Sequence, residues 1–256
     1  TSHAGATVHA YGRKVHHNSY GMDRDQPLLA QSGKPLSIMQ EAMQAGIRVG
    51  TVNSGHMAEP GTGVFLASSE DRYEEPGIVL QIMESGADLI FSGGEKYCLP
   101  KGTIGRHGAE GVREDNRNLL AEAEAAGYTV IYTREELMQL DADTENVIGI
   151  FAANDTYNVK TQAELREQGL ETYDPEAPTF DEMVAAALKI LGSDPEVPFF
   201  LVAEEEGTDN FSNKMNAKGM LDAMGRADAA IGEVLSFMEA QPDRDTLLLV
   251  GSDSDA

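Results

Sequence analysis

Short apolar runs alternate along the chain with longer amphipathic stretches. The runs are rich in β-branched and aromatic residues and are bounded by Gly, Asn or Asp, which is typical of buried strands. They predict strands over Ile47–Asn53, Leu89–Ser92, Thr129–Tyr132, Val147–Ala152, Phe199–Ala203 and Thr246–Val250. The amphipathic stretches predict helices over Ala4–Tyr11, Pro35–Ala45, Gly77–Glu84, Asn116–Ala126, Phe180–Leu191 and about Asn216–Ala240.

This alternation of strands and helices predicts a three-layer α/β/α sandwich with a mostly parallel central sheet. In the last helix Leu221, Met224 and Leu235 recur at helical spacing, so we expect them to face the core. In such folds, functional groups gather at the carboxyl ends of the strands. Those ends are therefore the places to search for chemistry.

Length and charge narrow the classes of function. The 256 residues, 41% of them hydrophobic, are enough for one domain over 1–256, although both ends are abrupt and predict a cut within a larger fold. A net charge of −24 excludes nucleic-acid binding and disfavours anionic membranes; it is compatible with simple solubility or with adaptation to high salt. Cys98 is the single cysteine, and neither a membrane-spanning run nor a signal peptide is visible.

Ser2 begins a predicted helix. A hydroxyl at a helix start lies beside free backbone N–H groups and the positive end of the helix dipole. That position suits a phosphoryl group, and it equally suits an ordinary helix N-cap. Ser2 alone does not decide between them.

Carboxylates follow three of the predicted strands. Glu59 and Thr62 come after the first strand and offer hard oxygen ligands for Mg²⁺, or else a helix-capping turn. Glu204 and Asp209 follow the buried strand at Phe199, where crowded charges need a compensating cation unless the loop is fully solvated. Asp253 follows the strand predicted over Thr246–Val250 in the same way, and the two acidic ends could share one cation.

All six histidines precede residue 108, and none accompanies the two acidic strand ends. A histidine-rich zinc site there is not supported, and the oxygen ligands favour Mg²⁺, Mn²⁺ or Ca²⁺. The chain contains no P-loop, dinucleotide fingerprint or Gly-x-Ser-x-Gly elbow.

Taken in order, these segments resemble the alkaline phosphatase family over nearly the whole chain. Residues 1–7, Thr-Ser-His-Ala-Gly-Ala-Thr, resemble the family's Asp-Ser-x-Ala-Gly/Ser-Ala-Thr nucleophile motif. Glu59 falls at a magnesium-site position, and Thr62 or Gly61 falls near a Thr ligand. Arg72 has the spacing of the phosphate-gripping Arg, whose guanidinium can bond two oxygens at once.

The resemblance extends to later metal ligands. Glu204 corresponds to the magnesium Glu, Asp209 to a zinc Asp, and Asp253 to the Asp of an Ala-Asp-His motif. Asn213 and Ser254 stand where the family has zinc-binding His residues, and we expect them to act as neutral ligands. The family's first strand and a late His have no counterpart, so the expected zinc site is depleted.

The resemblance implies a metal-dependent phosphomonoesterase that forms a phosphoserine at Ser2 and uses Mg²⁺ and Zn²⁺, with Mn²⁺ or Ca²⁺ as replacements. It implies small phosphate monoesters as substrates, a homodimer, and a periplasmic or secreted location. Two alternatives remain open. One is a weak or inactive module that binds phosphate or metal, and the other is a sister hydrolase that acts on phosphodiesters or sulfate esters.

Overall fold

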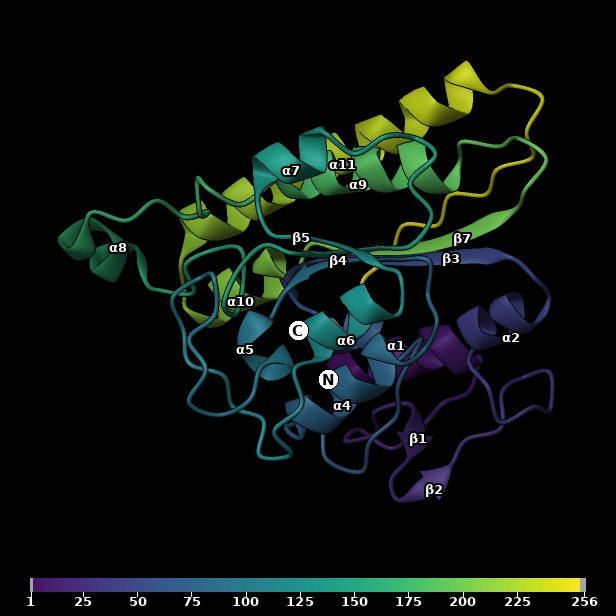
Figure 1. Ribbon diagram of the computed structural model, residues 1–256, viewed down its shortest axis with the longest axis horizontal. Coiled ribbons are helices and arrows are strands. Elements are labelled where there is room, and N and C mark those ends of the chain that lie inside the picture. The colour runs from purple at the N-terminus through teal and green to yellow at the C-terminus, as the bar shows by residue number, and fades with distance from the viewer. Residues whose placement is uncertain (1, 254–256) are drawn as a thin grey trace.

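A five-stranded parallel sheet lies between two layers of helices in the computed structural model, which describes residues 2–253 (Figure 1). The strand order is β5-β6-β4-β3-β7, and every neighbouring pair of these strands is parallel. This confirms the predicted α/β/α sandwich. The strands are β3 (Arg48–His56), β4 (Leu89–Gly93), β5 (Thr129–Ile131), β6 (Val147–Ile150) and β7 (Phe199–Glu204).

The helices divide between the two faces of the sheet (Figure 1). One face is covered by α1 (Ser2–Tyr11), α2 (Ile38–Gln44), α4 (Glu75–Met83) and α6 (Leu119–Ala125). The other is covered by α7 (Arg134–Met138), α9 (Phe180–Leu191) and α11 (Ala217–Ala240). Four short helices lie in the segments that follow strands: α3 (Pro60–Gly63), α5 (Glu95–Cys98), α8 (Gln162–Gln168) and α10 (Gly207–Asn213). A small antiparallel pair, β1 (Met22–Asp23) and β2 (Gln26–Pro27), lies apart from the main sheet.

Local sequence signals explain where the helices begin. α9 starts with a capping box in which Thr179 and Glu182 satisfy each other's backbone N–H groups. Its apolar residues then recur every three or four positions and bury one face of the helix against the sheet. α8 begins with the same device, Thr161 and Glu164, in a segment for which no helix was predicted.

The apolar stripe predicted for α11 is wrong. Leu221, Met224 and Leu235 are exposed. The packed face carries small residues up to Ala230, namely Gly219, Ala223 and Ala230, and then the partly buried Val234 and Phe237. The Cβ position of Gly219 lies 2.4 Å from the ring of Phe211, so a larger side chain there would collide with α10. Close approach of the neighbouring helix therefore selects the small face, and helical spacing alone did not reveal this.

The strand predicted over Thr246–Val250 is also wrong. In the structure this segment pairs with no strand among residues 2–253, although β7 is the edge strand beside which a sixth strand would lie. Leu247 and Leu249 are each 81% exposed, so most of the apolar surface that suggested a buried strand faces solvent. The segment nevertheless carries Asp253 back toward the first helix (Figure 1).

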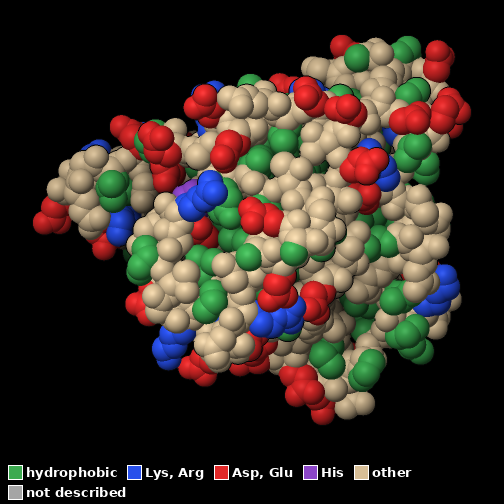
Figure 2. All heavy atoms as spheres, viewed as in Figure 1, with side chains coloured by type: hydrophobic (Ala, Val, Ile, Leu, Met, Phe, Trp, Pro, Cys, Tyr) green, Lys and Arg blue, Asp and Glu red, His purple; other side chains and the backbone are tan. Residues whose placement is uncertain are grey.

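Among the charged side chains on the face shown in Figure 2, the acidic ones are more widespread, and Lys and Arg form only small, separate groups. This agrees with the net charge of −24 and shows no basic patch on that face. Within residues 2–253, none of the helices combines the length and apolarity needed to cross a bilayer.

Candidate functional site

The carboxyl ends of β3 and β7 meet at one edge of the sheet, because the strands are parallel neighbours with Asn53 opposite Glu204. α3 follows β3 at this edge and packs against α1, the helix that Ser2 begins. Asp253, near the end of the described residues, lies against Gly5 in the first turns of α1. Segments from the start, the middle and the end of the described chain therefore converge there.

Asn53 links two of the predicted ligands. Its Nδ2 donates to Glu204 Oε2 at 2.5 Å and to Thr62 Oγ1 at 2.9 Å. A Cβ at Gly61 would lie 1.8 Å from Glu204 Oε1, so the glycine makes room for this carboxylate. Gly61 offers no side chain, which leaves the Thr62 hydroxyl as the alcohol ligand of the predicted pair.

The carboxylates at the end of β7 are electrostatically crowded. Burial, reinforced by the charges of Glu59 and Asp253, raises the pKa of Glu204 to about 8. Burial and the charge of Glu204 raise the pKa of Glu206 well above its ordinary value, and the two side chains share a hydrogen bond. Burial and the charge of Asp253 also raise the pKa of Asp209. A cation placed among these groups would relieve their repulsion.

Asp253 belongs to the same site although no strand delivers it. Its carbonyl oxygen lies where a Cβ of Gly5 would be, 1.5 Å from that position, so the chain passes directly over the first turns of α1. Asp253 Oδ2 is buried and has no hydrogen-bond partner. An unsatisfied carboxylate oxygen beside Glu204 and Asp209 is an oxygen that a cation would bind.

Arg72 joins α1 to the Glu59 segment. Its Nη1 donates to His3 Nδ1 at 2.7 Å, and its Nη2 lies 3.9 Å from Glu59 Oε2. Burial, together with the charge of Arg72, lowers the pKa of His3, which keeps the ring neutral and able to accept this bond. The guanidinium is therefore bonded to His3, the residue that follows Ser2, and 28% of the Arg72 side chain is exposed to receive an anion.

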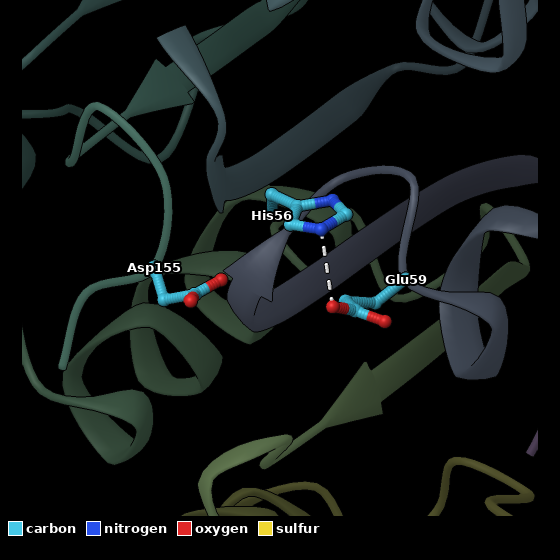
Figure 3. Close-up of side chains that lie close together, drawn as sticks. All are labelled: His56, Glu59 and Asp155. Carbon is cyan, nitrogen blue, oxygen red and sulfur yellow. Dashed lines mark ion pairs between the residues drawn. The ribbon is translucent and has the colours of Figure 1, made fainter. Parts of the chain in front are cut away.

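His56, Glu59 and Asp155 form a compact group beside this site. Figure 3 shows the two carboxylates approaching from opposite sides, with the imidazole between them. His56 Nε2 lies 3.1 Å from Glu59 Oε1, and ligand atoms of all three side chains lie within 4.8 Å of one another. Hydrogen bonding to Glu59 and its charge outweigh burial and raise the pKa of His56.

Comparison with known proteins identifies the family, because the sequence model of the alkaline phosphatases matches residues 1–256. The chain belongs to the alkaline phosphatase family. The alkaline phosphatase of Gadus morhua is 26% identical over 97% of this chain and 55% of its own length. The human tissue-nonspecific isozyme is 25% identical over 97% of this chain and 51% of its own. The chain thus spans about half the length of these relatives.

Solved alkaline phosphatases share the fold. The Thermus thermophilus enzyme superposes with a TM-score of 0.76 at 27% identity, covering 95% of this chain and 46% of that chain. A mutant of the alkaline phosphatase from the Antarctic bacterium TAB5, with Mg bound, superposes with a TM-score of 0.71. At 21% identity over 94% of this chain and 60% of that one, it shows the fold alone.

Membership of the alkaline phosphatase family implies divalent metal ions, and the donor atoms of this chain are of the kind that bind such ions. The side chains of Glu59, Glu204, Asp209 and Asp253 supply oxygen donors, and Thr62 supplies a hydroxyl. The raised pKa of Glu204 and the orphaned Oδ2 of Asp253 are both signs that the protein's own cations do not balance the carboxylates of the site.

The structure describes only one of the two positions, Asn213 and Ser254, at which the family has zinc-binding His residues. Asn213 ends α10 and donates from Nδ2 to Asp209 Oδ2 at 2.8 Å, so it supports a carboxylate ligand within the same helix. Ser254 lies outside the described residues, as does Thr1. The role of Asn213 as a direct ligand stays a prediction.

Four residues of the site were missed from the sequence. His3, Asn53, His56 and Asp155 each contact or neighbour a predicted site residue. His56 lies three residues before Glu59, but the sequence prediction considered histidine ligands only beside Glu204 and Asp253. Asp155 follows β6 in a long acidic loop, and its approach to His56 depends on sheet order, which no local pattern shows.

The apo protein should lose stability as pH rises from 6 to 9. The pKa of Glu204 is about 8 in the folded protein against an ordinary value of 4.5, so the folded state keeps a proton that the unfolded state releases; stability therefore falls from pH 4.5 to about 8 and levels off above it. Thermal unfolding in EDTA should give a lower Tm at pH 9 than at pH 6, and Mg²⁺ should restore most of the loss. Glu204→Gln should flatten the decline, because it removes the titrating carboxyl group; an equal decline in this variant would argue against the crowding of these carboxylates.

Proposed function

We propose that this chain carries the catalytic site of a metal-dependent phosphomonoesterase in which Ser2 accepts the phosphoryl group. The observation that carries the proposal is the convergence of the Ser2 helix start, Arg72 and the strand-end carboxylates at one edge of the sheet. A helix N-terminus and a guanidinium together suit the two or three oxygens of a terminal phosphate. Membership of the alkaline phosphatase family supports the same chemistry.

The reaction would proceed in two displacements at phosphorus. The Ser2 hydroxyl oxygen attacks, a bond from Oγ to phosphorus forms, and the bond to the leaving alcohol breaks. Water then attacks the phosphoserine, which releases inorganic phosphate and regenerates the hydroxyl. Arg72 holds two nonbridging oxygens through both steps, and His3 holds Arg72 by accepting its hydrogen bond.

Glu59, Thr62, Glu204, Asp209 and Asp253 would hold the cations, with Asn213 and Ser254 as neutral ligands. A bound divalent ion would lower the pKa of the attacking hydroxyl or water and offset charge on the phosphoryl oxygens. The oxygen-rich set favours Mg²⁺ or Mn²⁺ over Zn²⁺ at this position.

We further propose that the protein acts as a homodimer outside the cytoplasm, as the resemblance implies. Light scattering tests the oligomeric state, and fractionation of expressing cells tests the location.

Rates on three p-nitrophenyl esters test the reaction class. With Mg²⁺ or Zn²⁺ present, the phosphate monoester should turn over at least about a hundredfold faster than the phosphate diester or the sulfate. EDTA should abolish turnover, and the metal should restore it. Faster diester or sulfate hydrolysis would favour a sister hydrolase, while metal binding without turnover of any ester would favour an inactive binding module.

A further inference from the structure

His56 and Glu59 come from the turn after β3 and Asp155 from the segment after β6, and the three side chains point into one space (Figure 3). We propose that they form a binding site for a divalent transition-metal ion, Zn²⁺ or Mn²⁺, beside the carboxylates around Glu204. The inference rests on the cluster itself and not on phosphatase activity, so either proposal can fail alone. Glu59 is shared by this cluster and the Glu204 site, since it is one of the three clustered side chains and its charge also raises the pKa of Glu204.

The spacing of the donor atoms suits a small coordination sphere. Ligands about 2.0–2.1 Å from a tetrahedral ion lie roughly 3.3 Å from one another. The separation of 3.1 Å between His56 Nε2 and Glu59 Oε1 is close to that value, and all three donors lie within 4.8 Å. Small side-chain rotations would therefore bring them onto one ion.

Unsatisfied atoms show that the cluster has more donors than the protein uses. Asp155 Oδ1 and His56 Nδ1 are buried and have no hydrogen-bond partner. Asp155 Oδ2, by contrast, accepts from Asn154 Nδ2 at 2.8 Å, which fixes the carboxylate and leaves Oδ1 available. Buried polar atoms without partners are rare in proteins, and a ligand is one of the standard reasons for them.

Neighbouring groups orient the ligands as the outer shell of a metal site does. The Tyr97 ring packs edge-on against the His56 ring with centroids 5.2 Å apart. The other carboxylate oxygen of Glu59, Oε2, lies 3.9 Å from Arg72 Nη2. The side chains of His56 and Glu59 are each only 12% exposed, so bulk water competes little for the ion.

The backbone places Asp155 beside β3 by specific contacts. Thr156 N donates to Ser54 O at 3.0 Å, and Thr156 Oγ1 donates to the same oxygen at 2.6 Å. A Cβ at Gly93 would lie 1.8 Å from Asn154 O, so only glycine lets the loop after β6 cross the end of β4 this closely. The approach of Asp155 to His56 is thus built into the sheet.

The donor set selects the class of ion. One imidazole and two carboxylates suit Zn²⁺ or Mn²⁺, whereas Mg²⁺ and Ca²⁺ prefer oxygen alone. The competing account is a metal-free ion pair in which the imidazolium neutralises Glu59. That account gives no partner to Asp155 Oδ1, which the metal site would use.

Metal binding to the purified full chain distinguishes the two accounts. The protein is first treated with a chelator to remove bound metal. Mn²⁺ is then added, and electron spin-echo modulation records whether the ¹⁴N of an imidazole coordinates the ion. In a separate measurement, competition with a chromophoric chelator gives the affinity for Zn²⁺. The variants are His56→Gln and Asp155→Asn. Glu176→Gln is the control, because it removes an exposed carboxylate elsewhere in the loop that carries Asp155.

Wild type, Glu176→Gln and Glu204→Gln should all show ¹⁴N modulation, and His56→Gln should lose it. Asp155→Asn should weaken the tightest Zn²⁺ binding by at least about a hundredfold. Modulation that persists in His56→Gln, its absence from wild type, or unchanged Zn²⁺ affinity in Asp155→Asn would overturn the proposal. Circular dichroism of each variant separates loss of a ligand from loss of the fold.

Discussion

Ser2→Ala should lower phosphomonoester turnover by at least about a thousandfold, because it removes the oxygen to which the phosphoryl group is transferred. The fold should survive, since the substitution removes one atom from a half-buried side chain in a ten-residue helix. Steady-state rates with saturating Mg²⁺ and Zn²⁺ measure the effect. Phosphate affinity should fall much less than kcat, because Arg72 and the helix N-terminus remain.

A matched serine provides the control for this result. Ser236 lies on the exposed part of α11 and donates only to Gly232 O within the helix. Ser236→Ala should therefore leave turnover unchanged. Full activity in Ser2→Ala would mean that water attacks the ester directly or that another group is the nucleophile, and Ser2 would then be an ordinary residue at a helix start.

Arg72→Ala is expected to have the second largest effect, a loss of roughly 100- to 1,000-fold in kcat/KM. The guanidinium can make two charge-assisted bonds to phosphate oxygens, each worth about 1.5–3 kcal/mol. Its removal also leaves His3 Nδ1 without a donor and Glu59 without its cationic neighbour. Inhibition by inorganic phosphate should weaken in parallel with KM.

Arg72→Lys tests geometry separately from charge. Lysine keeps the positive charge but cannot form a planar two-point contact, so it should recover only part of the loss. Arg166→Ala, which removes an exposed arginine from α8, should change neither constant. Equal activity of the Lys variant and wild type would show that Arg72 contributes charge alone, and unchanged phosphate inhibition in Arg72→Ala would remove it from the site.

The centre of the sheet could be predicted from the sequence because buried parallel strands read as short apolar runs. β4 and β6, in which every residue is buried, are the clearest cases. Thr246–Val250 has the same composition but alternates between half-buried and exposed positions outside the sheet. Composition could not separate these two cases, because what distinguishes them is pairing with β7.

The site was predicted in part, for a related physical reason. Glu204 ends an apolar strand, and Glu59 and Asp209 lie shortly after the ends of β3 and β7, so the rule that chemistry gathers at strand ends found them. Asp155 reaches His56 only because β6 lies beside β4 and a glycine lets the following loop pass. Contacts between distant segments depend on strand order, which spacing along one chain does not encode.

The most direct test of the central claim is to identify the covalent intermediate. The protein is mixed with a phosphate monoester in the presence of Mg²⁺ and Zn²⁺, quenched in acid within the first turnovers, and digested with trypsin. Phosphoserine esters survive acid, so mass spectrometry should find one phosphoryl group on the peptide of residues 1–13, at Ser2, and none in Ser2→Ala. Turnover of the ester with no phosphate on that peptide, or with phosphate on another residue, would contradict the account.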